Sequence, residues 1–258
     1  MDTKKKISEI YEKGFKKIGK LYQRQYPNEE FCRFMGRNFF HIKKDKRKKI
    51  NFLEVGVGSG ANLSLISNEG FSASGIDISE ESIKISKKLF KKKKFSATLK
   101  VGDMTNIPFK SNTFDCVFDV FSSCSLTKND GGIFLREVNR VLKKGGKFFS
   151  YFPSKKSKMF KSRNKKMYDE DTISKLNEKK SIYKIMPMRF LDKKQYVKIL
   201  EKNNIHSYYV GELTRTYFKG RDQFTFVIIE SFKTPTDSKL SLELTGQQGD
   251  VMKESMKV

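Results

Sequence analysis

The feature that most constrains this chain is a glycine-rich turn at the end of an apolar segment. Residues 50–55 are mostly apolar and lead directly into Gly56, Gly58 and Gly60. Because glycine adopts positive φ and has no Cβ, this spacing predicts a buried strand that turns sharply and opens into a helix. Turns of this kind lie where open α/β sheets bind nucleotide-like ligands. A plain strand-to-helix connection without a ligand would have the same pattern.

Two carboxylates accompany this turn. Residues 71–76 read as a second strand that ends at Asp77, where a carboxylate about twenty residues beyond the turn can accept hydrogen bonds from a ribose diol. Glu54 lies inside the first strand, where a carboxylate is costly to bury unless it is hydrogen-bonded. It suits a cationic or amino-bearing ligand better than a pyrophosphate. The pattern therefore favours S-adenosylmethionine over NAD, and a nucleotide-dependent reductase is the least favoured alternative.

Five segments resemble, in order and spacing, the motifs of the class I S-adenosylmethionine-dependent methyltransferases. They are residues 53–63, 75–79, 101–109, 113–118 and 137–149. The resemblance covers about residues 50–152 and is nearest to the small-molecule group that includes quinone-biosynthesis methyltransferases. The chain departs from the family at Lys144, where proline is usual, and this position shapes only a turn.

The resemblance implies an α/β fold: a Rossmann-like, doubly wound, seven-stranded and mostly parallel sheet with a terminal antiparallel hairpin. Alternating strand-like and helix-like segments indicate the same class. Residues 205–213 and 223–232 are expected to form the hairpin, which a nicotinamide-binding domain lacks. Capping residues at Asn28, Ser79 and Asp192 predict three helix starts.

The domain organisation follows from these assignments. Residues 1–45 are expected to form an N-terminal helical cap, either as a wall of the substrate pocket or as a cover for the sheet. The methyltransferase domain is placed at residues 46–232, with a Lys-rich helical insertion or mobile lid at 153–187. Residues 233–258 are expected to be a disordered tail. Within it, residues 242–255 resemble a short stretch of Lon-type ATP-dependent proteases, from which no protease activity is inferred.

Charge is the most unusual property of the composition. The formal net charge is +25, which invites nucleic acid or an anionic membrane as partner. However, the excess is nearly all lysine in short scattered runs, and arginine, the better bidentate phosphate reader, is scarce. Solvated faces are therefore favoured over a dedicated polyanion site, and nucleic acid remains a possible but not favoured partner.

Metal binding and membrane insertion are not expected. The cysteines Cys32, Cys116 and Cys124 have no metal-binding spacing, and His41 and His206 are the two histidines of the chain. No window approaches the length of apolar sequence that a membrane span requires, and the N-terminus lacks a secretory signal. A cytoplasmic location is the resulting expectation.

The resemblance implies that nine residues bind the cofactor: Glu54, Gly56, Gly58, Gly60, Asp77, Ile78, Asp103, Met104 and Asp119. The glycines would contact the methionine and ribose parts, and Glu54 the amino-acid end. Asp77 would bind the ribose, Ile78 would pack on the adenine, and Asp103 would accept from the adenine amino group, with a backbone contact from the next residue. Asp119, or the backbone that follows it, would face the methionine.

The predicted function is methyl transfer from S-adenosylmethionine to an unidentified acceptor, with a small metabolite favoured. The basic surface keeps an RNA or protein methyltransferase as an alternative, and a non-catalytic cofactor-binding scaffold is a third. Residues 121–126 lack the Asn/Asp-Pro-Pro-aromatic run of enzymes that methylate base amino groups, and Cys124 has no Pro-Cys context for a covalent cytosine mechanism. No catalytic base is assigned, and the oligomeric state is left open. Candidates for the acceptor pocket are His41, Tyr11, Tyr22 and Tyr26.

Overall fold

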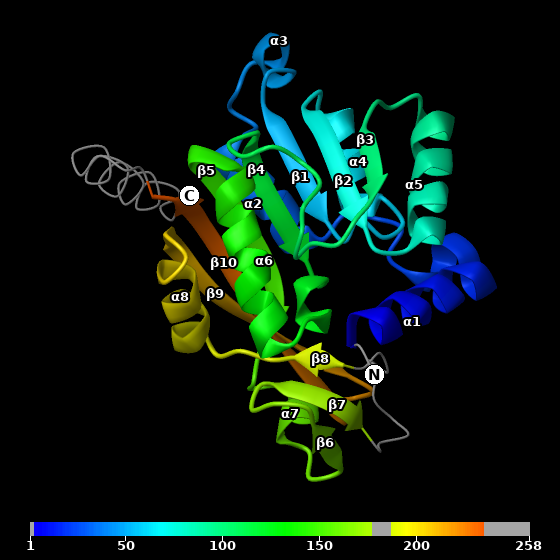
Figure 1. Ribbon diagram of the computed structural model, residues 1–258, viewed down its shortest axis with the longest axis vertical. Coiled ribbons are helices and arrows are strands. Elements are labelled where there is room, and N and C mark those ends of the chain that lie inside the picture. The colour runs from blue at the N-terminus through cyan, green and yellow to red at the C-terminus, as the bar shows by residue number, and fades with distance from the viewer. Residues whose placement is uncertain (1–2, 177–186, 235–258) are drawn as a thin grey trace.

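The computed structural model describes residues 3–176 and 187–234, which are built around one seven-stranded sheet (Figure 1). The strand order is β3-β2-β1-β4-β5-β10-β9. The first five pair in parallel, and β10 is antiparallel to both β5 and β9. The strands are β1 (Asn51–Val55), β2 (Ser72–Asp77), β3 (Thr98–Val101), β4 (Phe114–Val120), β5 (Leu142–Pro153), β9 (Ile205–Tyr217) and β10 (Asp222–Lys233). The predicted α/β class, mostly parallel sheet and terminal hairpin are confirmed.

Helices cover both faces of this sheet. The helices of the described residues are α1 (Thr3–Ile18), the 3₁₀ turn η1 (Gly19–Tyr22), α2 (Glu29–Asn38), α3 (Lys44–Arg47), α4 (Ala61–Asn68), α5 (Glu80–Lys93), η2 (Ser123–Ser125), α6 (Lys128–Val141), α7 (Lys158–Lys161) and α8 (Lys193–Glu201). The three predicted caps are confirmed: Asn28, Ser79 and Asp192 each accept a bond from a backbone N–H three residues later. These bonds satisfy donors that a helix start leaves free.

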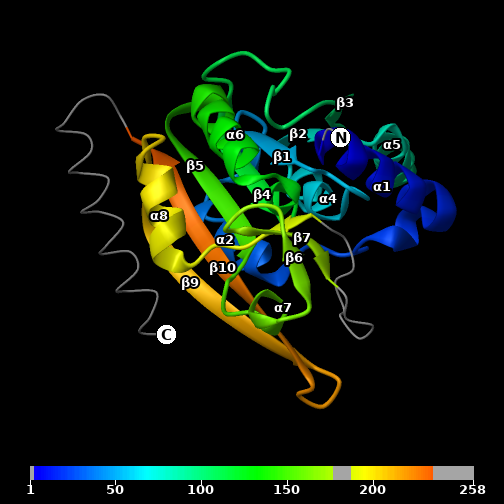
Figure 2. The same cartoon turned by 60° about the horizontal axis from the view of Figure 1, so that its bottom comes forward.

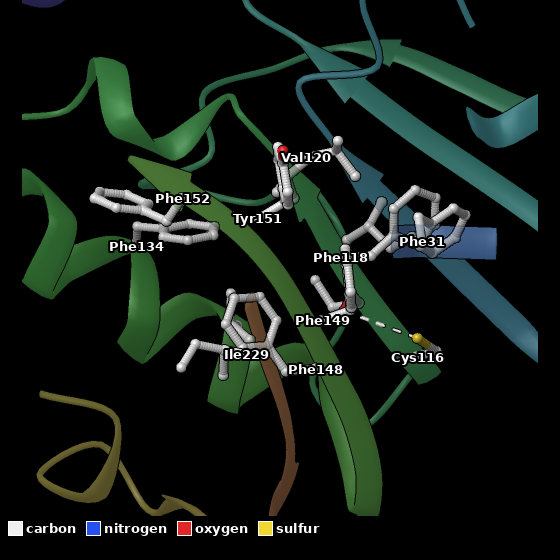
Figure 3. Packing of buried hydrophobic residues seen from close by; sticks show 14 of the residues in the cluster. Phe31, Cys116, Phe118, Val120, Phe134, Phe148, Phe149, Tyr151, Phe152 and Ile229 are labelled. Atoms are coloured by element: carbon white, nitrogen blue, oxygen red, sulfur yellow. Dashed lines mark hydrogen bonds between the residues drawn. The ribbon is translucent and has the colours of Figure 1, made fainter. Parts of the chain in front are cut away.

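The core is unusually rich in phenylalanine (Figure 3). On one face, Phe31 of α2 is fully buried and stacks on Phe118 of β4, with ring centroids 4.2 Å apart. On the other face, Phe134 of α6 meets Phe148 of β5 edge-on at 6.2 Å. Phe148 and Phe149 are adjacent in β5, and successive strand side chains point to opposite faces. Since Phe149 contacts Phe31, α2 and α6 cover opposite faces of the sheet.

The helical character predicted for residues 153–187 is wrong: their described part contains only one helical turn, α7. Strands β6 (Lys165–Met167) and β7 (Thr172–Leu176) form an antiparallel sheet with β8 (Met188–Arg189), which follows the segment. The role of the segment as an insertion or lid stays a prediction. β7 can form because Ile173 is fully buried, although alternation over so few residues is too short to predict a strand. Figures 1 and 2 place this small sheet beyond the carboxyl ends of the parallel strands.

Several other sequence predictions concern segments whose structure is only partly described. The N-terminal cap contains α1, which lies beside α5, and α2, which packs on the sheet (Figure 2). Of the predicted tail, Lys233 ends β10, and residues 235–258 lie outside the described residues, as do 177–186 of the insertion. The domain boundaries therefore stay predictions. Within the described ranges, no helix combines the length and apolar character needed to cross a membrane.

The aromatic core predicts a large stability difference between two phenylalanine substitutions. Phe31→Ala should lower the free energy of unfolding by about 3–5 kcal/mol, because it leaves a cavity between α2 and the sheet. Phe218→Ala is the matched control, since this ring is 60% exposed, and its effect should stay within about 0.5 kcal/mol. Urea unfolding followed by circular dichroism measures both. Equal effects would show that α2 does not contribute to the core as described.

Candidate functional site

The glycine turn after β1 packs tightly against its neighbours. Gly56 and Gly58 have φ values of +74° and +54°, which residues with a side chain rarely adopt. A Cβ on Gly56 would lie 2.3 Å from the Cβ of Ser122, so a larger residue would separate the turn from the segment after β4. Gly60 does not approach the segment after β4. It is the N-cap of α4 and faces Phe90 of α5.

Asp77, at the end of β2, ties this turn to the next helix. Its carboxylate accepts a 2.8 Å bond from the Gly58 N–H on one oxygen and a 2.9 Å bond from the Ser79 N–H on the other. Burial raises the pKa of Asp77, although these backbone bonds oppose the rise. A carboxylate offers about four acceptor positions, so both oxygens retain capacity for further donors. The arrangement fixes the side chain at the edge of a pocket and leaves it able to bind hydroxyl groups.

Glu54 is the least satisfied group of the site. It is 1% exposed, and its Oε1 accepts a 2.8 Å bond from the side-chain amide of Asn62. Its Oε2 is buried and has no hydrogen-bond partner. Burial raises the pKa of Glu54 to about 8, against the opposing effects of the Asn62 bond and the positive charge of Arg24. An orphaned buried carboxylate oxygen is costly in either protonation state, so this site calls for a donor from a ligand.

Two adjoining pockets make one cleft at the carboxyl edge of the parallel strands. They enclose about 700 Å³ and about 1010 Å³, including space open to solvent. We name the two pockets after the roles that the sequence resemblance implies for their residues. The first, the nucleoside pocket, is lined by Asp77, Ile78, Asp103 and Met104 among others. The second, the amino-acid pocket, is lined by Glu54 and Asn62 among others. Six residues line both pockets and mark their junction: Tyr11, Gln23, Gly56, Val120, Phe121 and Ser125.

The structure thus brings together six of the nine residues singled out in the sequence. Gly58 and Gly60 are not among the lining residues and instead shape the turn. Asp103 lines the nucleoside pocket while its Oδ1 accepts a 2.8 Å bond from the Thr105 N–H. That bond holds the loop after β3 in place beside Met104.

Asp119 is not brought to the cleft. It is fully buried at the end of β4, where Oδ1 accepts bonds of 3.0 Å from the backbone N–H groups of Ser122 and Ser123. The hydroxyls of both serines also donate to it, as does Ser150. So many donors make it an anchor for the turn after β4. The backbone that follows, at Val120 and Phe121, does line the cleft, and this was the alternative given with Asp119.

The N-terminal cap supplies residues that sequence reasoning did not assign to the cofactor. Tyr11 and Gln23 line both pockets, and Arg24 lines the amino-acid pocket beside Glu54. The Arg24 carbonyl accepts a 2.6 Å bond from the hydroxyl of Ser59 in the glycine turn. Tyr11 was a candidate for the acceptor pocket, whereas Gln23 and Arg24 were indicated only by the prediction that the cap walls a pocket. No local pattern shows which cap residues reach a turn some thirty positions later.

Asn62 is a second residue that was missed. Its side-chain oxygen accepts a 2.8 Å bond from the Asn28 N–H, and its nitrogen donates to Glu54. It therefore links the start of α2 to the buried carboxylate. The sequence indicated a role for Asn62 only through its position in the first turn of α4, directly after the glycine turn.

Comparisons with known proteins agree with this geometry. Residues 53–150 match the family model described as a methyltransferase domain. The demethylmenaquinone methyltransferase of Tropheryma whipplei is 33% identical over 96 residues, which are 37% of this chain and 38% of that protein. A sterol 4-C-methyltransferase of Caenorhabditis elegans is 28% identical over 111 residues, which are 42% of this chain and 33% of the relative. The chain thus spans between a third and two fifths of the length of these curated relatives.

Solved structures show the same fold. An S-adenosylmethionine-dependent methyltransferase from Methanosarcina mazei superposes with a TM-score of 0.62 at 19% identity, covering 71% of this chain and 92% of the other. Magnesium protoporphyrin IX methyltransferase from Synechocystis, solved with bound S-adenosylmethionine, gives a TM-score of 0.58 at 13% identity over 91% of this chain and 98% of the other. Similarity at this level of identity establishes the architecture.

The raised pKa of Glu54 predicts a pH-dependent stability difference. The folded-state value of about 8 exceeds the ordinary 4.5, so the folded protein binds the extra proton and loses stability as pH rises between these values. Glu54→Gln, which cannot ionise, should therefore gain in free energy of unfolding relative to the wild type between about pH 6 and pH 8. Denaturant unfolding at several pH values measures this difference.

Glu137→Gln provides the control for that experiment. The Arg140 bond holds the pKa of Glu137 below its ordinary value, so this carboxyl is ionised in both states above about pH 6. Its substitution should change stability by a constant amount over the same range. A constant difference for Glu54→Gln as well would contradict the burial assigned to Glu54.

Proposed function

We propose that this chain, whose residues 53–150 belong to the methyltransferase-domain family, transfers a methyl group from S-adenosylmethionine to a small organic acceptor. The observation that carries the proposal is the buried, unpartnered Oε2 of Glu54 in the amino-acid pocket. An ammonium group there would supply both the missing donor and the missing positive charge. S-adenosylmethionine has an ammonium group on the end opposite its adenine.

The two pockets fit the two halves of that cofactor. In the nucleoside pocket, Asp77 would accept from the ribose hydroxyls, and Ile78, Asp103 and Met104 would hold the adenine. In the amino-acid pocket, Glu54 would bind the ammonium group and Arg24 the carboxylate. Such a pairing matches both charges of a zwitterion and fixes its orientation.

The reacting centre lies at the junction of the two pockets. S-adenosylmethionine supplies the electrophilic methyl carbon when bound, and the chain's task is to position an acceptor against it. The described lining of both pockets contains no histidine or lysine, so no general base is assigned. Of the candidates for the acceptor pocket, Tyr11 and Tyr22 line this cleft. Tyr26 lines a third hollow beside the amino-acid pocket, and His41 lines neither the cleft nor that hollow.

Relatives named for a quinone and for a sterol support a small organic acceptor rather than RNA or protein. The direct test is incubation of the protein with methyl-labelled S-adenosylmethionine and a fractionated cell extract. Label in a small-molecule fraction supports the proposal. Label in RNA or protein favours the alternatives, and cofactor binding without transfer to any fraction favours a non-catalytic scaffold.

Removal of the ribose acceptor should weaken cofactor binding. Asp77→Ala should raise the Kd for S-adenosylhomocysteine by at least about tenfold, because two charge-assisted hydrogen bonds are lost. Asp115→Ala, at the opposite end of the sheet, is the control and should leave the Kd unchanged. Isothermal titration calorimetry measures both, and circular dichroism checks that each variant is folded. Unchanged affinity of a folded Asp77→Ala protein would remove this residue from the site.

Cofactor binding should also release a proton at neutral pH. With a pKa of about 8, the free Glu54 carboxyl is mostly protonated at pH 7, and pairing with an ammonium group favours its ionised form. Calorimetric titration of S-adenosylhomocysteine in buffers of different ionisation enthalpy measures the release. It should be close to one proton for the wild type and absent for Glu54→Gln. Equal proton release by the two proteins would show that Glu54 does not contact the amino-acid end.

A further inference from the structure

A second hollow opens beside the amino-acid pocket and has no role in the cofactor site. It lies between the segment that leads into α2 and the ends of β5, β9 and β10. Aromatic and arginine side chains line most of it, namely Arg24, Tyr26, Tyr151, Arg215, Tyr217 and Phe226, and the carboxylate of Glu29 lines it as well. It encloses about 770 Å³, including space open to solvent. We call it the aromatic groove.

The groove adjoins the junction where the methyl carbon would lie. Arg24 lines both the amino-acid pocket and the groove. Tyr151, in the groove, is paired in register with Val120, at the junction, and Figure 3 shows the two side by side. The Phe121 N–H donates a 2.9 Å bond to the Tyr151 carbonyl. The groove and the junction are therefore neighbours, with Arg24 and Tyr151 between them.

Buried rings form the base of the groove and an exposed ring lies at its rim: Tyr151 and Phe226 are each 3% exposed, whereas Tyr26 is 82% exposed. Tyr151 and Phe226 stack with centroids 4.3 Å apart and an angle of 19° between their planes. Phe121 meets Phe226 edge-on at 5.7 Å and itself lines both cofactor pockets. Its φ of +62° is strained for a bulky residue, and such strain is found where a site requires it. Phe121 thus continues the aromatic wall from the groove to the junction.

The groove also offers a positive charge. Arg215 is 46% exposed and lies 3.6 Å from Glu29, whose other carboxylate oxygen accepts a 3.0 Å bond from Arg33. Glu29 is itself 60% exposed, and pairs of this kind hold their partners weakly. With two arginines sharing one carboxylate, Arg215 can turn toward an anion in the groove. A cationic ligand would meet the repulsion of both Arg24 and Arg215.

We infer that the aromatic groove binds the methyl acceptor, and that this acceptor is a planar aromatic compound with an anionic group. Its ring packs against the exposed Tyr26, above the base formed by Tyr151 and Phe226, and its anion is bound by Arg215. The inference rests on the proposed function, because the groove is an acceptor site only if the neighbouring cleft holds the methyl donor.

The test compares matched anionic and neutral probes. The full chain, saturated with S-adenosylhomocysteine, is titrated by ligand-observed NMR with 4-hydroxybenzoate, 4-hydroxycinnamate and 6-hydroxy-2-naphthoate, and with the primary amide of each. At least one carboxylate should bind about tenfold more tightly than its amide, the effect of one charge-assisted hydrogen bond. Arg215→Gln should abolish that preference while leaving the affinity for S-adenosylhomocysteine unchanged.

Arg221→Gln is the matched control, since Arg221 is an exposed arginine at the turn of the same hairpin and does not line the groove. It should keep the preference for the carboxylate. Equal binding of carboxylates and amides by the wild type, or equal loss in the two variants, would overturn the inference and leave the proposed function intact. Failure of the wild type to bind S-adenosylhomocysteine would instead contradict the proposed function, and the inference with it.

Discussion

The site depends on a carboxylate held inside the sheet with half of its hydrogen bonding unfilled. Glu54 lies on β1, next to the turn that every ligand in the cleft must approach, and one of its oxygens has no donor. Burial of such a group opposes folding unless a partner compensates. The surrounding structure keeps it there, through Asn62 and the aromatic core behind the strand. A cationic ligand is the partner that makes this arrangement favourable.

The N-terminal cap joins the two ligand regions. Its Asn28 begins α2, which packs on the core, and bonds to the Asn62 that holds Glu54. Four residues earlier, Arg24 separates the amino-acid pocket from the aromatic groove. A change in the path of this short segment would therefore alter the proposed cofactor and acceptor sites together. This coupling gives the cap a direct part in the site, beyond covering the sheet.

The sequence predicted the sheet, the hairpin and three helix caps because local patterns determine them. It also placed Glu54 and Asp77 at the edge where the cleft lies, since strand ends and glycine turns have a fixed position in this fold. It could not place Arg24, whose contact with the turn depends on how the cap docks. It suggested helix for the segment after β5, where tertiary contacts of a single buried Ile173 favour a strand. The sequence also could not show that Asp119 is an internal anchor, because a position at a strand end does not reveal which donors surround a carboxylate.

A crystal structure of the protein with S-adenosylhomocysteine tests the central claim most directly. The account predicts the homocysteine nitrogen within hydrogen-bond distance of Glu54 Oε2 and the ribose hydroxyls at Asp77, with the sulfur at the junction beside Gly56. A ligand bound elsewhere, or one whose adenine occupies the pocket beside Glu54, would contradict it.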